Sequence, residues 1–177
     1  MKDLTLIEDV WTINREHIDV LIEDQVIKEI VPHKTGPQIN MASQLKLIQG
    51  QGGLLSAPFV DAHFHLDATL SLGRPRLNES GTLFEGIQIW AEQKPLLTEE
   101  DVYERAKTLI HWAIARGTLA MRTHVDIGDR QLKAVRALLK LREEIKSFFD
   151  LQIVAFPQDG YLRQAHAKTL LNEALDL

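Results

Sequence analysis

Two histidines, His63 and His65, stand one residue apart in the segment VDAHFHLDATLS, residues 60–71. Side chains of an extended segment alternate between its faces, so these two imidazoles point the same way from Cα atoms about 6–7 Å apart. Such a pair can bind one metal ion through bonds of about 2.0–2.1 Å, or it can be a polar strand end with two solvated histidines. Because a catalytic metal uses at least three protein ligands, the pair is only part of a site.

Three further residues with suitable chemistry follow in the segment LAMRTHVDI, residues 119–127. Alternation places Arg122, His124 and Asp126 on one side of this segment if it is extended. They could be additional metal ligands, outer residues that orient a ligand by hydrogen bonding, or members of a buried polar network. The remaining histidines fall in N-terminal strands, a loop or helices and are expected at the surface: His17, His33, His111 and His166.

Gln158 ends a third apolar segment, LQIVAFPQ, residues 151–158. Its carboxamide offers both a donor and an acceptor, which suits the amide-like edge of a pyrimidine, although a loop or capping contact would use the same groups. The earlier segment SGTLFE is typical of a helix start, with Thr82 and Glu85 forming a capping box. Lining of a pocket by Leu83 would be an additional role.

Strands must position these residues, and from about residue 53 the sequence alternates between predicted strands and helices. Each of three predicted strands has one apolar face and one face that becomes polar toward its C-terminal end. In the first strand, Val60, Ala62 and Phe64 are expected on the apolar face, opposite His63 and His65. A (β/α)₈ barrel places its active site in this way.

Amphipathic helices are expected over residues 98–116, over residues 131–146, and from Gln164 to the end of the chain, where the pattern has no terminator. The first of them opens with a capping-box-like sequence at Thr98 and closes with a glycine. The sequence therefore predicts an α/β fold that contains the first three βα units of a barrel.

The N-terminal part of the sequence has a different pattern. Residues 18–22 and 26–31 are rich in β-branched residues around a turn, and residues 34–43 are typical of a loop. We therefore expect two domains, a β segment over residues 1–55 and a barrel portion over residues 56–177.

Composition excludes several classes of protein. The 177 residues are 45% hydrophobic and 25% charged, which is ordinary for a globular protein. A formal net charge of −5 without a long basic run argues against a nucleic-acid partner. No apolar stretch approaches about 18 residues, so no membrane span is expected. The N-terminus lacks the apolar region of a signal peptide, which favours a cytoplasmic location.

The sequence contains no cysteine. Disulfide scaffolds, thiol catalysis and cysteine-ligated zinc are therefore excluded for this chain. Any metal ion must bind histidine nitrogens and carboxylate oxygens.

The segment from Pro58 to about Leu175 resembles the N-terminal half of the cytosine deaminases of the amidohydrolase superfamily. Four stretches carry this resemblance, in order and at similar spacing: FVDAHFHLDATLSLG, NESGTLFEGIQIWAE, MRTHVDIGD and DLQIVAFPQDG. The two spaced histidines alone indicate only the superfamily, whereas SGTLFEGI and LQIVAFPQ indicate the cytosine deaminase branch. The other deaminase design, which binds zinc through a PCxxC motif, is excluded by the absence of cysteine.

The resemblance implies a hydrolytic deamination of cytosine to uracil and ammonia, assisted by one divalent ion, Fe²⁺ or Zn²⁺. It also implies that residues 1–55 are part of a small β-sandwich attached to the barrel. His63 and His65 would be metal ligands and Gln158 would bind the pyrimidine edge. The pocket around the ring would be lined by Leu83, Val154 and Phe156.

The same resemblance implies that the chain lacks the remaining ligands. The third histidine ligand, the proton-shuttling glutamate, a further histidine and the metal-binding aspartate would come from strands beyond Leu177. Activity is therefore expected to need the missing barrel half, in the same polypeptide or in a second one, and a homo-oligomer is compatible with the sequence. The alternatives are an inactive fragment or association module, and an amidohydrolase that acts on another aminated ring such as isoguanine or an aminotriazine.

Overall fold

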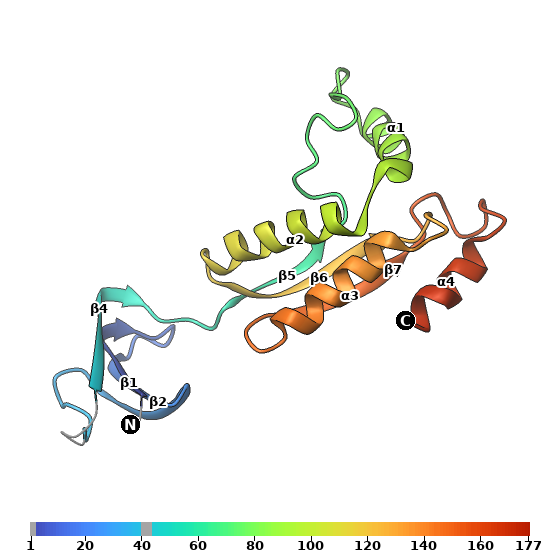
Figure 1. Ribbon diagram of the computed structural model, residues 1–177. Helices are drawn as coiled ribbons and strands as arrows, with labels where there is room; N and C mark the ends of the chain where they lie inside the picture. The colour runs from blue at the N-terminus through green and yellow to red at the C-terminus, as the bar shows by residue number, and fades with distance from the viewer. Residues whose placement is uncertain (1–2, 40–43) are drawn as a thin grey trace. The chain divides into compact units, whose positions relative to one another are not determined.

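The computed structural model describes residues 3–39 and 44–177, and the chain divides into two compact units, Met1–Ala57 and Pro58–Leu177 (Figure 1). Residues 40–43, which belong to the predicted loop over 34–43, lie outside the described residues. No helix in the described part of the chain is long and apolar enough to cross a membrane.

Unit 1 contains one four-stranded sheet with the order β3-β2-β1-β4. Its strands are β1 (Asp3–Trp11), β2 (His17–Glu23), β3 (Val26–Pro32) and β4 (Gln44–Leu54). The β1–β2 and β2–β3 pairs are antiparallel, and β1 pairs with β4 in parallel. The predicted strands at 18–22 and 26–31 are confirmed as β2 and β3. A β-sandwich would need a second sheet, which the described residues of this unit do not contain.

A β-bulge divides the first strand of this sheet. Leu4 and Leu6 pack with Leu21 in one apolar cluster, whereas Val10 packs with Ile18 in another. The pairing register of β1 shifts between Ile7 and Val10, and the extra residue turns the side chains that follow to the opposite face. The bulge therefore gives each side of the sheet its own small core.

Unit 2 is an α/β unit built on a three-stranded parallel sheet with the order β5-β6-β7. Its elements in chain order are β5 (Phe59–Phe64), α1 (Leu83–Gln93), the short 3₁₀ helix η1 (Lys94–Leu96), α2 (Glu99–Ile114), β6 (Thr118–Asp126), α3 (Lys133–Ile145), β7 (Asp150–Phe156) and α4 (Ala167–Leu175). The predicted α/β alternation and the three predicted helices are confirmed. The third helix begins three residues later than expected and ends at Leu175, before the chain end.

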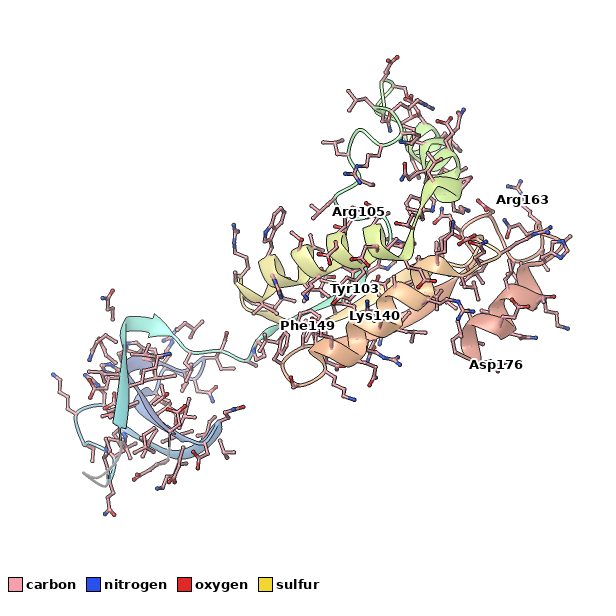
Figure 2. The ribbon with its side chains drawn as sticks, in the orientation of Figure 1. Tyr103, Arg105, Lys140, Phe149, Arg163 and Asp176 are labelled. Carbon is pink, nitrogen blue, oxygen red and sulfur yellow. The ribbon has the colours of Figure 1, made fainter. Side chains whose placement is uncertain are left out.

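The core of unit 2 lies between the sheet and the helices α2 and α3, which lie side by side over it (Figure 1). Leu138 and Leu141 of α3 and Ile110 of α2 have no exposed surface. On the solvent side of this layer, Glu144 of α3 accepts hydrogen bonds from Tyr103 and Lys107 of α2, and Lys140 lies 4.6 Å from the centre of the Tyr103 ring (Figure 2). Apolar contacts hold the two helices together, and these exposed polar contacts lie over them.

The strands β6 and β7 have the two faces that alternation predicts. Met121 and Val125 of β6 and Leu151 of β7 are buried beneath the helices, whereas Arg122 is exposed on the other face. Because α2 and α3 cover only one face, the polar ends of these strands remain accessible at the other.

The prediction for β5 is wrong in one respect. Asp61 and Phe64 line a hollow with residues of α2, while Val60 and Ala62 line a different hollow with Arg122. Val60 and Ala62 therefore do not share a face with Phe64. The pairing of β5 with β6 is irregular between Asp61 and Phe64, and such an irregularity shifts the alternation by one residue.

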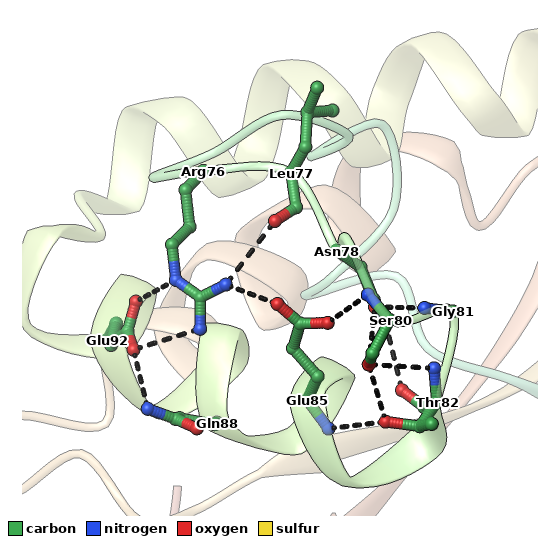
Figure 3. Close-up of polar contacts among 9 residues, drawn as sticks. All are labelled: Arg76, Leu77, Asn78, Ser80, Gly81, Thr82, Glu85, Gln88 and Glu92. Carbon is green, nitrogen blue, oxygen red and sulfur yellow. Dashed lines mark hydrogen bonds and ion pairs between the residues drawn. The ribbon is translucent and has the colours of Figure 1, made fainter.

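A network of polar contacts closes the start of α1 (Figure 3). Thr82 is the N-cap residue, and its hydroxyl accepts a hydrogen bond from the Glu85 amide at 3.3 Å. The Glu85 carboxylate accepts from the Ser80 amide at 2.6 Å and from Arg76 at 2.6 Å, instead of from the Thr82 amide. These contacts, the Ser80 hydrogen bonds first, lower the pKa of Glu85 to about 2. The predicted capping box is thus half formed, and Arg76, which also binds Glu92, completes the network.

We expect Thr82→Ala to destabilise α1 by about 0.5–2 kcal/mol, because the amide that Thr82 accepts from loses its partner. Amide hydrogen exchange within residues 83–93 should accelerate by several-fold. Thr82→Ser, which keeps the hydroxyl, is the matched control and should exchange like the parent chain. Equal exchange in the alanine variant and the parent would contradict the assignment of Thr82 as the cap.

Candidate metal centre

Three imidazoles meet at the C-terminal edge of the parallel sheet. The ring centre of His63 lies 5.4 Å from that of His65 and 4.2 Å from that of His124, and the His65 and His124 centres lie 5.8 Å apart. The ring of Phe156, at the end of β7, lies 5.7 Å from His65 and 6.0 Å from His124. The irregular pairing of β5 between Asp61 and Phe64 puts His63 and His65 on the face of the sheet that carries His124 of β6. Neighbouring strands thus place three imidazoles and one phenyl ring in contact.

His124 carries the observation that tests whether a metal ion fits here. Its Nδ1 is buried and has no hydrogen-bond partner among the described residues, whereas buried polar atoms are nearly always bonded. Burial first, and then the nearby His63 and His65, lower the pKa of His124. A neutral imidazole with a free nitrogen is the form that binds metal ions. The donor set therefore fits a divalent ion.

The arrangement does not give a complete coordination shell. The three imidazoles do not place one nitrogen each within 4.8 Å of the other two. His63 is exposed, so its ring has room to change its rotamer. His63 and His65 are the residues that could hold an ion together, with His124 beside them as a further nitrogen.

Asp126 ends β6 and is nearly buried, with 5% of its surface exposed. Its Oδ2 accepts from the indole nitrogen of Trp90 at 2.8 Å and lies 2.7 Å from Nζ of Lys94, and its Oδ1 accepts from the Gly128 amide at 2.7 Å. The predicted network with Arg122 does not include Asp126, because Arg122 donates to Gln152 at 3.0 Å. Asp126 is held by residues of the α1 and η1 region instead.

Asp67 follows the histidine pair in the chain and is 1% exposed. Burial, and to a lesser degree the Asp126 carboxylate, raise its pKa to about 6, although amide donors from Asp126 and Ala68 act against this rise. A carboxyl group with such a pKa can take up or release a proton near neutral pH. Sequence reasoning gave Asp67 no role, although its position two residues after His65 could have indicated one.

Lys94 is the second residue that sequence reasoning missed. Its ammonium group lies 2.7 Å from Asp126 and 2.8 Å from Asp159, and its side chain is 11% exposed. Burial alone would lower the pKa of Lys94, but the two carboxylates raise it overall. A Cβ atom on Gly128 would lie 2.7 Å from Nζ, so a larger residue there would displace the ammonium group. No local pattern in the sequence places Lys94, which precedes α2, near the ends of β6 and β7.

Arg105 of α2 fixes the loop that follows β5 (Figure 2). Both terminal nitrogens of its guanidinium donate to the Asp67 carbonyl at 3.1 Å, and one also donates to the Thr69 carbonyl. The Leu66 amide donates to the buried hydroxyl of Thr123 at 2.9 Å. The backbone on either side of Asp67 is therefore tied to α2 and β6.

A cavity of about 240 Å³ adjoins His65 of the histidine pair. Two residues predicted to bind substrate, Gln158 and Leu83, line it together with His65 and Trp90. Val154 and Phe156, the other predicted pocket residues, are half-buried on β7 and do not line this cavity. Phe156 contacts the imidazoles instead. The cavity can therefore hold a small planar molecule beside the candidate metal ligands.

The surface prediction for the other histidines holds for His111 and His166, which are exposed. It is wrong for His17 and His33, which are half-buried in unit 1 and contact one another. Their cross-strand positions, which the sequence does not show, explain the difference.

A donor set at the C-terminal edge of a parallel sheet, next to a small cavity, is typical of metal-dependent hydrolases. Comparison with known proteins also finds hydrolases, namely deaminases and an amidohydrolase. One similar solved structure is that of 5-methylcytosine deaminase from Klebsiella pneumoniae liganded with 5-fluorocytosine. The two sequences are 36% identical, and the structures superpose with a TM-score of 0.85 over 97% of this chain. It is 31% identical over 139 residues to N-isopropylammelide isopropyl amidohydrolase of Pseudomonas sp. (strain ADP), and 28% identical over 144 residues to pterin deaminase of Rhizobium rhizogenes (strain K84 / ATCC BAA-868). The predicted resemblance to cytosine deaminases is thereby confirmed.

These matches cover only part of each relative. The alignments span 73% and 80% of this chain but only 34% and 32% of the two curated relatives, and the chain covers 41% of the Klebsiella structure. No protein-family model matches the chain.

Proposed function

We propose that this chain is the N-terminal part of a metal-dependent hydrolytic deaminase that converts cytosine and water to uracil and ammonia. The observation that carries the proposal is the convergence of His63, His65 and His124 beside a cavity that contains Gln158. Similarity to an enzyme named 5-methylcytosine deaminase supports the choice of a pyrimidine.

In this proposal each candidate site residue has a defined role. A divalent ion, Fe²⁺ or Zn²⁺, bound by His63 and His65 would supply Lewis-acid activation of a water molecule. The carboxamide of Gln158 would donate to and accept from the ring edge, which orients C4 of cytosine toward the histidine pair. Leu83 would cover the ring and exclude bulk water. In the net reaction, the water oxygen would become bonded to C4 and the C4–N bond would break. One water proton would end on ring N3 and the other on the amino nitrogen, which would leave as ammonia.

We further propose that residues 1–55 belong to a small β-sandwich and that residues 56–177 form the first three βα units of a barrel. The strand edges of β5 and β7 would then pair with further strands from the remainder of the protein or from a second polypeptide. That remainder would supply the other metal ligands and the groups that transfer protons.

A second candidate function differs only in the ring that is deaminated. Relatives named for ammelide and pterin substrates support an aminotriazine or a fused ring such as isoguanine. The polar residues that line the cavity, His65, Asp67, Asp126, Trp90 and Gln158, could serve either class of ring.

The test is a chimera in which this chain replaces the matching 41% of the Klebsiella enzyme. We expect the zinc- or iron-loaded chimera to release ammonia from cytosine at least about 10²-fold faster than its His63→Ala/His65→Ala variant. The isolated chain should show negligible turnover. A folded, metal-loaded chimera that releases no ammonia from cytosine, isoguanine or ammelide would refute the proposal, and activity on ammelide alone would favour the second candidate.

A further inference from the structure

Three aromatic rings form a row across unit 1. Trp11, at the end of β1, pairs with His17 at the start of β2, and the His33 amide donates to the His17 carbonyl at 2.9 Å. The Trp11 and His17 rings are stacked with centres 4.4 Å apart and planes at 8°, and the His17 and His33 centres lie 4.2 Å apart. The imidazole of β2 and that of the residue after β3 thus face each other at one end of the sheet.

The β1 bulge adds a carboxylate to this pair. Asp9 has a φ of 57°, and its Oδ1 lies 2.7 Å from Nε2 of His17. The opposite strand accommodates the bulge through Gly50, where a Cβ atom would lie 2.2 Å from Cγ1 of Val10 and 2.7 Å from the Asp9 carbonyl. A backbone held in this conformation fixes where the Asp9 side chain starts, so its contact with His17 follows from the bulge.

A second carboxylate, that of Asp19, contacts both His33 and the backbone of Asp9. Asp19, whose side chain is 4% exposed, has its Oδ1 2.8 Å from Nδ1 of His33 and accepts from the Asp9 amide at 2.9 Å. Because a carboxylate accepts, the neutral form of the His33 ring would carry its proton on Nδ1 and present the lone pair of Nε2. A histidine oriented in this way by a carboxylate is the usual arrangement for metal-binding histidines.

We propose that Asp9, His17 and His33 bind a divalent transition-metal ion such as Zn²⁺. One ligand atom from each of these residues lies within 4.8 Å of the other two. Ligand atoms around a tetrahedral zinc ion are about 3.3–3.5 Å apart, so side-chain movements of about 1 Å are sufficient. All three residues are half-buried, so solvent reaches the cluster and water would take a fourth position. Asp19 orients His33 and does not contact the ion.

This site belongs to unit 1 and does not depend on the deaminase proposal. The ion would join the bulge of β1, the start of β2 and the residue that follows β3. Since a metal that binds only the folded sheet stabilises it by mass action, zinc should raise the midpoint of thermal unfolding of unit 1.

The experiment uses the full chain with His63→Ala/His65→Ala, which removes the candidate ligands of unit 2. Equilibrium dialysis against Zn²⁺ with elemental analysis should find one ion per chain. His33→Gln and Asp9→Asn should each lower the zinc affinity at least about 100-fold, and Asp19→Asn should lower it about 10–100-fold. Asn tolerates a positive φ, so Asp9→Asn keeps the bulge if His33→Gln does not fold. His111→Gln, in an exposed position on α2, is the matched control and should bind like the parent.

Fluorescence locates the ion. Cu²⁺ should quench Trp11, which stacks on His17, and Trp11→Phe should remove that component of the quenching while the zinc stoichiometry remains one. Failure of the parent chain to bind zinc would overturn the proposal. Unchanged affinity in folded Asp9→Asn would overturn it as well, because the rings and hydrogen bonds would then be a metal-free packing arrangement.

Discussion

Lys94→Met is expected to lower the free energy of unfolding of unit 2 by about 3–5 kcal/mol, because it leaves Asp126 buried without its positive partner. The Asp126 side chain is 3% exposed, and Lys94 lies 2.7 Å from it. Methionine has a similar volume, so the loss is one of charge more than of packing. Asp159, which is 32% exposed, can turn to water and should add little to the effect.

The matched control is Lys107→Met, which breaks a pair of the same length at the surface. Lys107 lies 2.7 Å from Glu144, and both side chains are about one-third or more exposed. Exposed pairs contribute about 0–1 kcal/mol, so this variant should unfold almost like the parent. Urea titration followed by far-UV circular dichroism measures both. A Lys94→Met effect no larger than that of Lys107→Met would show that water reaches Asp126.

The double replacement His63→Ala/His65→Ala should reduce the metal affinity of unit 2 more than 10²-fold, since loss of a single outer partner already costs about 10–100-fold. Both imidazoles that could hold the ion are removed, and His124 alone cannot replace them. Elemental analysis after dialysis should show one ion fewer per chain than in the parent. The ion is counted in a His17→Gln/His33→Gln background, so that a site in unit 1 does not obscure the result.

His166→Ala serves as the control for this experiment, because that histidine is exposed and lies on the N-terminal side of α4. Its metal content should equal that of the parent. If the double variant keeps the full metal stoichiometry, the histidine pair is a solvated strand end and the deaminase proposal loses its metal ligands. Circular dichroism of both variants shows whether unit 2 remains folded.

The two candidate metal sites differ in what surrounds the histidines. In unit 2 an unpartnered Nδ1 of His124 lies beside His63 and His65, and a cavity adjoins them. In unit 1 the carboxylates Asp9 and Asp19 already bind the imidazoles. The first arrangement leaves room for a substrate, whereas the second favours an ion that joins strands.

Local sequence determined most elements of unit 2 and the strands β2 and β3 of unit 1. Period-two alternation predicts β6 and β7 with their buried and accessible faces, and helical periodicity predicts α2 and α3 within about two residues. The spacing of His63 and His65 and the cap at Thr82 were also visible, because each depends on neighbours within a few residues. The resemblance of four short motifs to cytosine deaminases followed from the same local information.

Tertiary structure alone decided the features that depend on pairing between distant segments. The bulge at Asp9 interrupts the pairing of β1 with both of its neighbours, and Gly50 admits it from 41 positions away in the chain. The irregularity in β5 that places Val60 beside Arg122 depends in the same way on β6. Lys94 reaches Asp126 and Asp159 only after the sheet and its helices have packed. Alternation cannot reveal a shifted residue or a long-range ion pair, since neither leaves a periodic signal in the sequence.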